Sequence, residues 1–119
     1  LNYKDDYDKY TNHWMKKKNF TGILQELIDR GELGKSEDVD FIMDHLNESS
    51  TFAMTRYVDF ALGLVENQYG IKRIEYYLFN GSNIQRNYSS LYFNRRGDWD
   101  LVKKAFNEGL IDEIQAYAR

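Results

Sequence analysis

The chain has 119 residues, 42% hydrophobic residues and a net charge of −3, a composition typical of one globular domain that excludes wholesale disorder. It contains no cysteine, which excludes disulfides and thiolate metal sites, and no apolar run near the ~18 residues that span a membrane. The first residues lack the pattern of a signal peptide, so we expect a cytoplasmic protein that does not associate with membranes.

The first half of the chain has irregular helical patterns. Proline is absent, which favours an all-α fold. Helical spacing places four aromatic side chains on one face near the start, namely Tyr3, Tyr7, Tyr10 and Trp14. A second helix is expected over residues 21–30, with a turn from Gly31 to Gly34, and Ser36 is expected to cap the next helix.

The longest helix is expected from about Thr51 to Asn67. Its apolar spacing predicts one inward face made of Ala53, Tyr57, Phe60, Ala61, Leu64 and Val65.

From Gly70 onward the elements become shorter and more regular. One helix is expected to end at Gly81, and the next to end near Gly97. The pairs Ser82/Gln85 and Asp112/Gln115 both have the spacing of a capping box. Between these pairs, Asp98 is expected to cap a helix that ends before Gly109 and buries Trp99, Val102, Ala105 and Phe106.

Three short segments recur thirty residues apart: Met54-Thr55-Arg56-Tyr57, Ile84-Gln85-Arg86-Asn87 and Ile114-Gln115-Ala116-Tyr117. A fixed period between about 20 and 50 residues is typical of stacked helical hairpins. The alternative is that caps and isoleucines recur by chance. We therefore expect one all-α domain of about seven or eight helices, with helical-hairpin repeats over residues 51–119 after an irregular helical part over residues 1–50.

Residues 84–98 resemble one HEAT-like repeat. They begin with an aliphatic-x-Arg segment, continue with the small residues Ser89 and Ser90, and end with Gly97-Asp98 after an apolar stretch. Residues 54–63 form a looser copy, so the resemblance covers residues 51–119. It implies an α-solenoid that acts as a scaffold through a concave groove, while a minority of such proteins handle DNA or modified bases.

The candidates for catalysis and metal binding have simpler structural interpretations. His45 shares a helix with Asp40, Asp44 and Glu48, which could hold a divalent cation, but a solvated acidic face is the favoured interpretation. No phosphate-binding glycine motif is present, and no motif places a base near any serine. We favour structural roles for Asp59, Glu66 and Glu75, and expect neither an enzyme nor a cofactor or metal ion.

Arginines and tyrosines in the repeats are the candidate binding residues. Arg56 and Arg86 occupy equivalent positions, and in a helical stack such positions line up along one surface. The candidate residues are Arg56, Tyr57, Tyr77, Arg86, Arg95 and Arg96, and Lys72, Arg73, Lys103 and Lys104 could extend them into a basic ladder. Such a ladder could bind a protein, bind nucleic acid, or serve only to hold neighbouring hairpins together.

The sequence favours a non-catalytic module that binds a protein or peptide on this Arg/Tyr face. The alternative is a nucleic-acid-binding helical-repeat protein, which the net charge of −3 disfavours. An apolar edge made of Ile111, Ile114 and Tyr117 also predicts self-association into a homo-oligomer.

Overall fold

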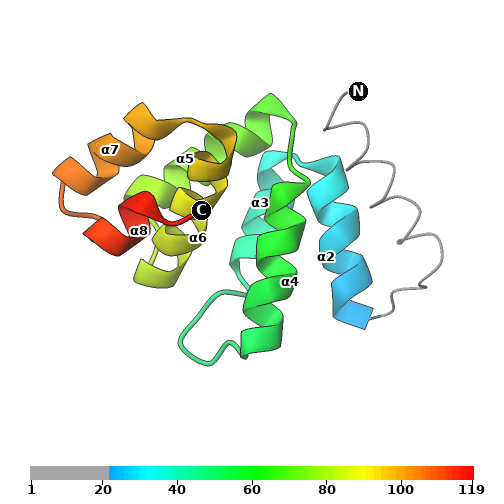
Figure 1. The fold of residues 1–119 in the computed structure, drawn as a ribbon. Helices are drawn as coiled ribbons and strands as arrows, with labels where there is room; N and C mark the ends of the chain where they lie inside the picture. The colour runs from blue at the N-terminus through cyan, green and yellow to red at the C-terminus, as the bar shows by residue number, and fades with distance from the viewer. Residues whose placement is uncertain (1–21) are drawn as a thin grey trace, which may run out of the picture.

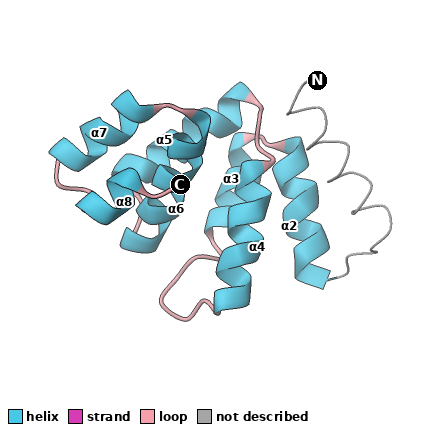
Figure 2. Ribbon diagram, viewed as in Figure 1, coloured by secondary structure: helices cyan, strands magenta, loops and turns pink. Residues whose placement is uncertain are grey.

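The computed structural model describes residues 22–119, and the predicted aromatic helix near residues 3–14 lies outside them. Within this part every regular element is an α-helix, as the sequence predicts (Figures 1 and 2). The helices are α2 (Gly22–Leu33), α3 (Ser36–Met43), α4 (Phe52–Gly63), α5 (Gln68–Asn80), α6 (Asn83–Arg96), α7 (Trp99–Asn107) and α8 (Glu113–Tyr117).

The main contacts join helices that are adjacent in the chain or separated by one other helix. The even-numbered helices form a series in which α2 contacts α4, α4 contacts α6 and α6 contacts α8 (Figure 1). α3 contacts α5, and α7 contacts α6 and α8. One hydrophobic core runs from Leu27 to Ile111, and α6 contacts four other helices of the described part: α4, α5, α7 and α8.

The turn predicted at Gly31 is wrong, because α2 continues through this glycine to Leu33. Gly31 is buried, and a Cβ atom there would collide with the carbonyl oxygen of Ala61 in α4. The helix ends instead before Gly34, which has a φ of 63°. Gly31 therefore serves the close packing of α2 against α4 rather than chain reversal.

The start of α3 also differs from the prediction. Ser36 is the first helical residue rather than the cap, and its Oγ donates to the carbonyl oxygen of Tyr69 at 3.3 Å. The backbone N of Lys35 donates to the Asp38 carboxylate at 3.0 Å, and Arg30 of α2 pairs with the same carboxylate at 3.1 Å. A first-turn carboxylate thus joins α2 to α3.

Helix α4 is shorter than expected, and α6, with 14 residues, is the longest in the described part of the chain. The inward face of α4 is also rotated from the predicted one, since Ala53 is exposed while Tyr57, Phe60 and Leu64 are only half-buried. Its buried side chains are Thr55, Val58, Ala61 and Leu62, with Val65 just beyond the helix. The aromatic residues therefore lie at the boundary of the core, as large amphipathic side chains can.

Both predicted capping boxes are confirmed. Ser82 Oγ accepts from the Gln85 backbone N at 3.3 Å, and Asp112 Oδ1 accepts from the Gln115 backbone N at 2.7 Å. Thr51 caps α4 in the same way, accepting from the Met54 backbone N at 3.1 Å. Helices α4, α6 and α8, which follow one another in the even-numbered series, thus begin at nearly equal intervals along the chain.

The predicted cap at Asp98 is only partly right. Asp98 occupies the cap position of α7, but its carboxylate pairs with Arg96 at 3.3 Å instead of accepting a backbone hydrogen bond of the helix. Gly97 ends α6 with a φ of 81°, and Gly109, just beyond the end of α7, has a φ of 75°. Both glycines provide the left-handed backbone that other residues rarely adopt.

Small and polar residues of α6 are buried, and one near its end holds the last helix in place. Ser89 and Ser90 are fully buried, which leaves space for the helices that pack around α6. Asn94 is also buried, and its Nδ2 donates to the carbonyl oxygens of Ala116 at 3.0 Å and Ala118 at 2.8 Å.

The helices of residues 22–119 include no candidate for a membrane-spanning segment, by length and hydropathy.

Candidate interaction surface

The six predicted binding residues interact with different parts of the molecule. Arg56 is exposed, and its guanidinium lies 5.7 Å from the ring centre of Phe52, itself exposed. Tyr57, the next residue in α4, is half-buried and packs against the core. Of these two neighbours, Arg56 is the more accessible to a partner.

Arg86 is tied to backbone oxygens rather than presented to solvent. Its Nε donates to the carbonyl oxygen of Leu110 at 2.7 Å, and its Nη1 donates to the carbonyl oxygen of Gly81 at 2.8 Å. These bonds join the turn before α6 to the turn before α8. The contacts of Arg86 thus match the structural interpretation of the repeat arginines, whereas those of Arg56 do not.

Tyr77 belongs to a polar cluster between α3 and α5. Its hydroxyl donates to Asp40 Oδ1 at 2.7 Å, and Arg73 Nε donates to the same oxygen at 2.6 Å. The Arg73 guanidinium lies 4.2 Å from the ring centre of Tyr76. Burial, followed by the hydrogen bond to Asp40, raises the pKa of Tyr77 to about 12.

This cluster predicts a loss of stability at alkaline pH. Because the pKa of Tyr77 is higher in the folded state than the usual value of about 10, its contribution is complete below pH 10 and is lost between pH 10 and about 12. The melting temperature of Tyr77→Phe should therefore fall less steeply over that interval than that of the wild type. Thermal unfolding followed by circular dichroism measures both slopes, and parallel curves would contradict the assignment.

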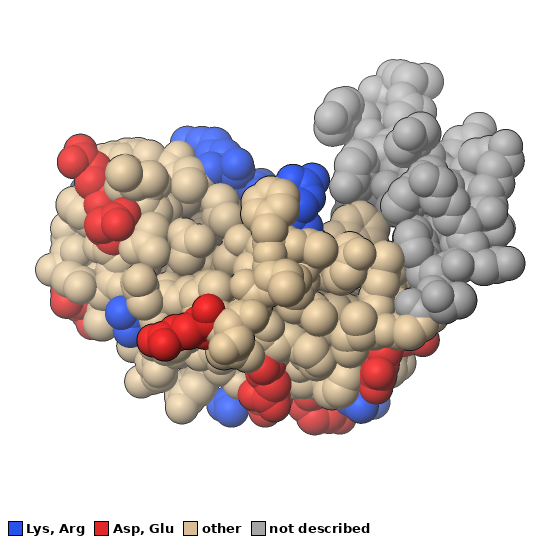
Figure 3. All heavy atoms as spheres, turned by 90° about the horizontal axis from the view of Figure 1, so that it is seen from below, with Lys and Arg blue, Asp and Glu red and all other residues tan. Residues whose placement is uncertain are grey.

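Arg95 and Arg96 form ion pairs. Arg95 pairs with Asp59 of α4 at 2.8 Å, and Arg96 pairs with Asp98 at 3.3 Å while its guanidinium lies 5.4 Å from the ring centre of Tyr92. On the face drawn in Figure 3, basic and acidic side chains are interspersed, and uncharged residues cover most of the surface. This face therefore carries no continuous basic band.

Four of the acidic and histidine candidates make contacts within the fold. His45 Nδ1 lies 2.8 Å from the carbonyl oxygen of Phe41, and Asp40 belongs to the cluster with Tyr77. Asp59 pairs with Arg95, and Glu75 pairs with Lys72 at 3.7 Å. Over residues 22–119, no group of three His, Asp or Glu side chains is placed to hold a metal ion.

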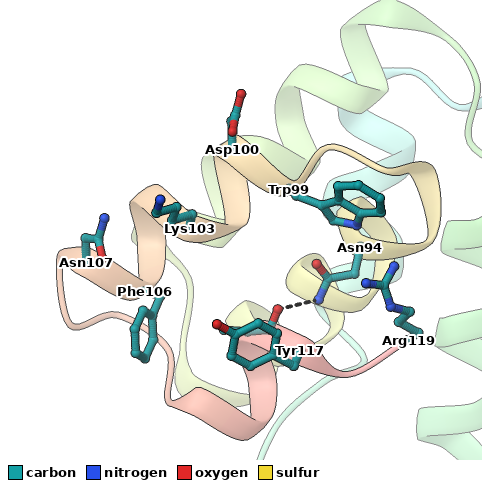
Figure 4. Close-up of a pocket in the computed structure, with 9 residues that line it drawn as sticks. Asn94, Trp99, Asp100, Lys103, Phe106, Asn107, Tyr117 and Arg119 are labelled. Carbon is teal, nitrogen blue, oxygen red and sulfur yellow. Dashed lines mark hydrogen bonds between the residues drawn. The ribbon is translucent and has the colours of Figure 1, made fainter.

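A pocket of about 410 Å³ opens between α7, α8 and the end of α6. Figure 4 shows Trp99 and Phe106 extending from α7 and Tyr117 from α8, with Asn94 behind them. The hydrogen bond drawn there, from Asn94 to Ala116, holds α8 beside the pocket. The lining residues are Asn94, Trp99, Asp100, Lys103, Phe106, Asn107, Ala116, Tyr117 and Arg119.

Large apolar side chains are exposed on α7 and α8, and three of them line this pocket. We define the α7–α8 surface as Trp99, Phe106, Ile114 and Tyr117, whose exposed fractions are 56%, 38%, 81% and 70%. The exposure of Ile114 and Tyr117 agrees with the predicted apolar edge. Ile111, the third residue of that edge, is instead buried in the core.

The burial predicted for Trp99 and Phe106 is wrong, and their helical positions explain the error. Val102 and Ala105 form the buried stripe of α7. Trp99, Lys103 and Phe106 have the i, i+4, i+7 spacing of a separate stripe on the side of that helix. This spacing is a signal in the sequence, but it does not reveal which of the two stripes the core covers.

Comparisons of the chain with protein-family models, with curated proteins and with solved structures found no match.

Proposed function

We propose that this chain is a non-catalytic protein-interaction module built as a HEAT-like stack of helical hairpins. The helix contacts support a stack, because the helix pairs with the most contacts are adjacent along the chain or two places apart. The matched caps of α4, α6 and α8 support a repeat of about thirty residues.

The observation that carries the interaction role is the exposed α7–α8 surface. Four large apolar side chains are exposed on consecutive helices, and three of them, Trp99, Phe106 and Tyr117, line one pocket. Exposed apolar groups gathered in this way are typical of contact surfaces, and Trp and Tyr are enriched among residues that dominate binding energy. The proposed partner surface is therefore at α7 and α8, and Arg56 with Phe52 remains a second accessible pair.

The nucleic-acid alternative has less support. Several cations that could bind phosphates are already paired with carboxylates: Arg30, Lys72, Arg73, Arg95 and Arg96. Phosphate contacts would have to replace these pairs or rely on the other cations, which in residues 22–119 are Lys35, Arg56, Arg86, Lys103, Lys104 and Arg119.

A capture experiment with matched variants tests the proposal. The wild-type chain, the double variant Ile114→Ser/Tyr117→Ser and the control Tyr69→Ser are immobilised and exposed to lysate of the native host treated with nuclease. Tyr69 is a suitable control because it is 64% exposed on α5, outside the α7–α8 surface. The wild type and the control should retain the same protein in equal amounts, and the double variant should lose most of it.

Three outcomes would contradict the proposal. Equal retention by the double variant would place the contact elsewhere, and retention of nucleic acid without nuclease, with a steep salt dependence, would favour the alternative. A strict absence of retained protein would remove the interaction role.

Light scattering at high concentration separately tests self-association through Ile114 and Tyr117, and a strict monomer would count against it.

A further inference from the structure

We propose that the pocket between α7 and α8 binds a peptide segment of a partner protein in which a bulky apolar side chain lies next to carboxylates. This inference rests on the proposed function and names the chemistry of its partner. Aromatic side chains form the walls of the pocket, and two cations that line it have no carboxylate partner in the described part of the chain.

The walls of the pocket fit an apolar side chain. Trp99, Phe106 and Tyr117 face the same space from two helices (Figure 4). Its volume of about 410 Å³ lies in the range of small-ligand pockets, about 300–1,000 Å³, and can hold one or two large side chains. Aromatic walls favour an aromatic or branched aliphatic group, since such groups gain most from leaving water.

The charges at the pocket favour an anionic neighbour. Lys103 and Arg119 line it, and the Arg119 guanidinium lies 5.1 Å from the ring centre of Trp99. Over residues 22–119, no carboxylate lies within ion-pair distance of either cation. Asp100 is the one acidic lining residue, and it points away from the space between the aromatic rings (Figure 4).

The same charges disfavour a second copy of this chain as the occupant. In a two-fold dimer, the same surface of both chains forms the interface, so four cations, Lys103 and Arg119 of each chain, would lie in one interface. Like charges gathered in one interface cost binding energy. A peptide that brings its own carboxylates has no such penalty.

Fluorescence of Trp99 provides a direct measurement. The chain has two tryptophans, so Trp14→Phe leaves Trp99 as the single reporter. The probe is acetyl-Ser-Asp-Phe-Glu-Gly-amide, compared with versions in which Asn and Gln replace the acids or Ala replaces Phe. We expect a saturable change in emission with the probe and binding about ten-fold weaker for each altered peptide.

Matched variants identify the cations. Lys103→Gln should weaken probe binding about five-fold, since it removes one partly exposed ion pair. Lys104→Gln is the control, because it removes the same charge one residue along α7, from a side chain that does not line the pocket and lies 5.3 Å from the Phe79 ring centre. Binding in the control should be unchanged, and binding of the acidic probe should weaken as salt rises.

Several results would overturn the inference. They are the absence of a saturable change, equal binding of the acidic and amide peptides, and equal effects of Lys103→Gln and Lys104→Gln. Emission that changes only with chain concentration would assign the pocket to a second copy. If Trp14→Phe does not fold, the indole N–H signals of the wild type in a nitrogen–proton NMR titration give the same comparison. If the peptides fail while capture still depends on Ile114 and Tyr117, the inference falls and the interaction module stands.

Discussion

Replacing Gly70 with alanine is expected to lower the free energy of unfolding by about 3 kcal/mol. A Cβ atom at this position would collide with the carbonyl oxygen of Gly34 and lie 2.8 Å from Val65 Cγ1. Because the nearest obstacle is backbone, a side-chain rotation cannot relieve it. The first turn of α5 would have to move away from the turn between α2 and α3.

Gly63→Ala is the control for this prediction. Gly63 is the last residue of α4, and a Cβ atom there would meet nothing within 4 Å. Its stability should equal or slightly exceed that of the wild type, since alanine has the higher helix propensity. Urea unfolding followed by circular dichroism compares the two variants. Equal stabilities would mean that the close approach at Gly70 does not constrain the fold.

Replacing Arg86 with alanine is expected to cost about 2 kcal/mol of folding stability. The change removes two hydrogen bonds from a charged donor and leaves the carbonyl oxygens of Leu110 and Gly81 without this partner. Arg86→Lys should recover little, because an ammonium group cannot reproduce the planar fork that reaches both oxygens.

Arg56→Ala is the matched control, since Arg56 occupies the equivalent repeat position but is exposed. Its stability should stay within about 0.5 kcal/mol of the wild type. Chemical denaturation measures both variants under the same conditions. If Arg86→Ala were as stable as Arg56→Ala, the bonds to the two turns would contribute little, and a binding role for Arg86 would regain support.

Several local features of the fold could be predicted from the sequence, although the caps at Ser36 and Asp98 were not among them. The capping boxes at Ser82 and Asp112 depend on residues three apart, so their spacing is visible in the chain itself. The end of α6 at Gly97 depends on a left-handed backbone for the same local reason. Gly31 could not be predicted correctly, because its role depends on Ala61 in another helix.

The candidate surface shows the same division between local and distant causes. The i, i+4, i+7 spacing of Trp99, Lys103 and Phe106 is present in the sequence, but their exposure depends on which side of α7 the core covers. Likewise, the repeat position predicts that Arg86 and Arg56 are equivalent. Their contacts differ because Arg86 donates to the carbonyl oxygens of Leu110 and Gly81, whereas Arg56 lies over the ring of Phe52.

The amide of Asn94 links the integrity of the pocket to a single side chain. With five residues, α8 is far too short to be stable alone. The Asn94 amide donates hydrogen bonds to the carbonyl oxygens of Ala116 in α8 and of Ala118 just after it. Tyr117 and Arg119, which line the pocket, therefore depend in part on this attachment for their positions. A bound segment that contacts these residues would strengthen the attachment in return, so occupancy of the pocket and order of the last helix would be thermodynamically coupled.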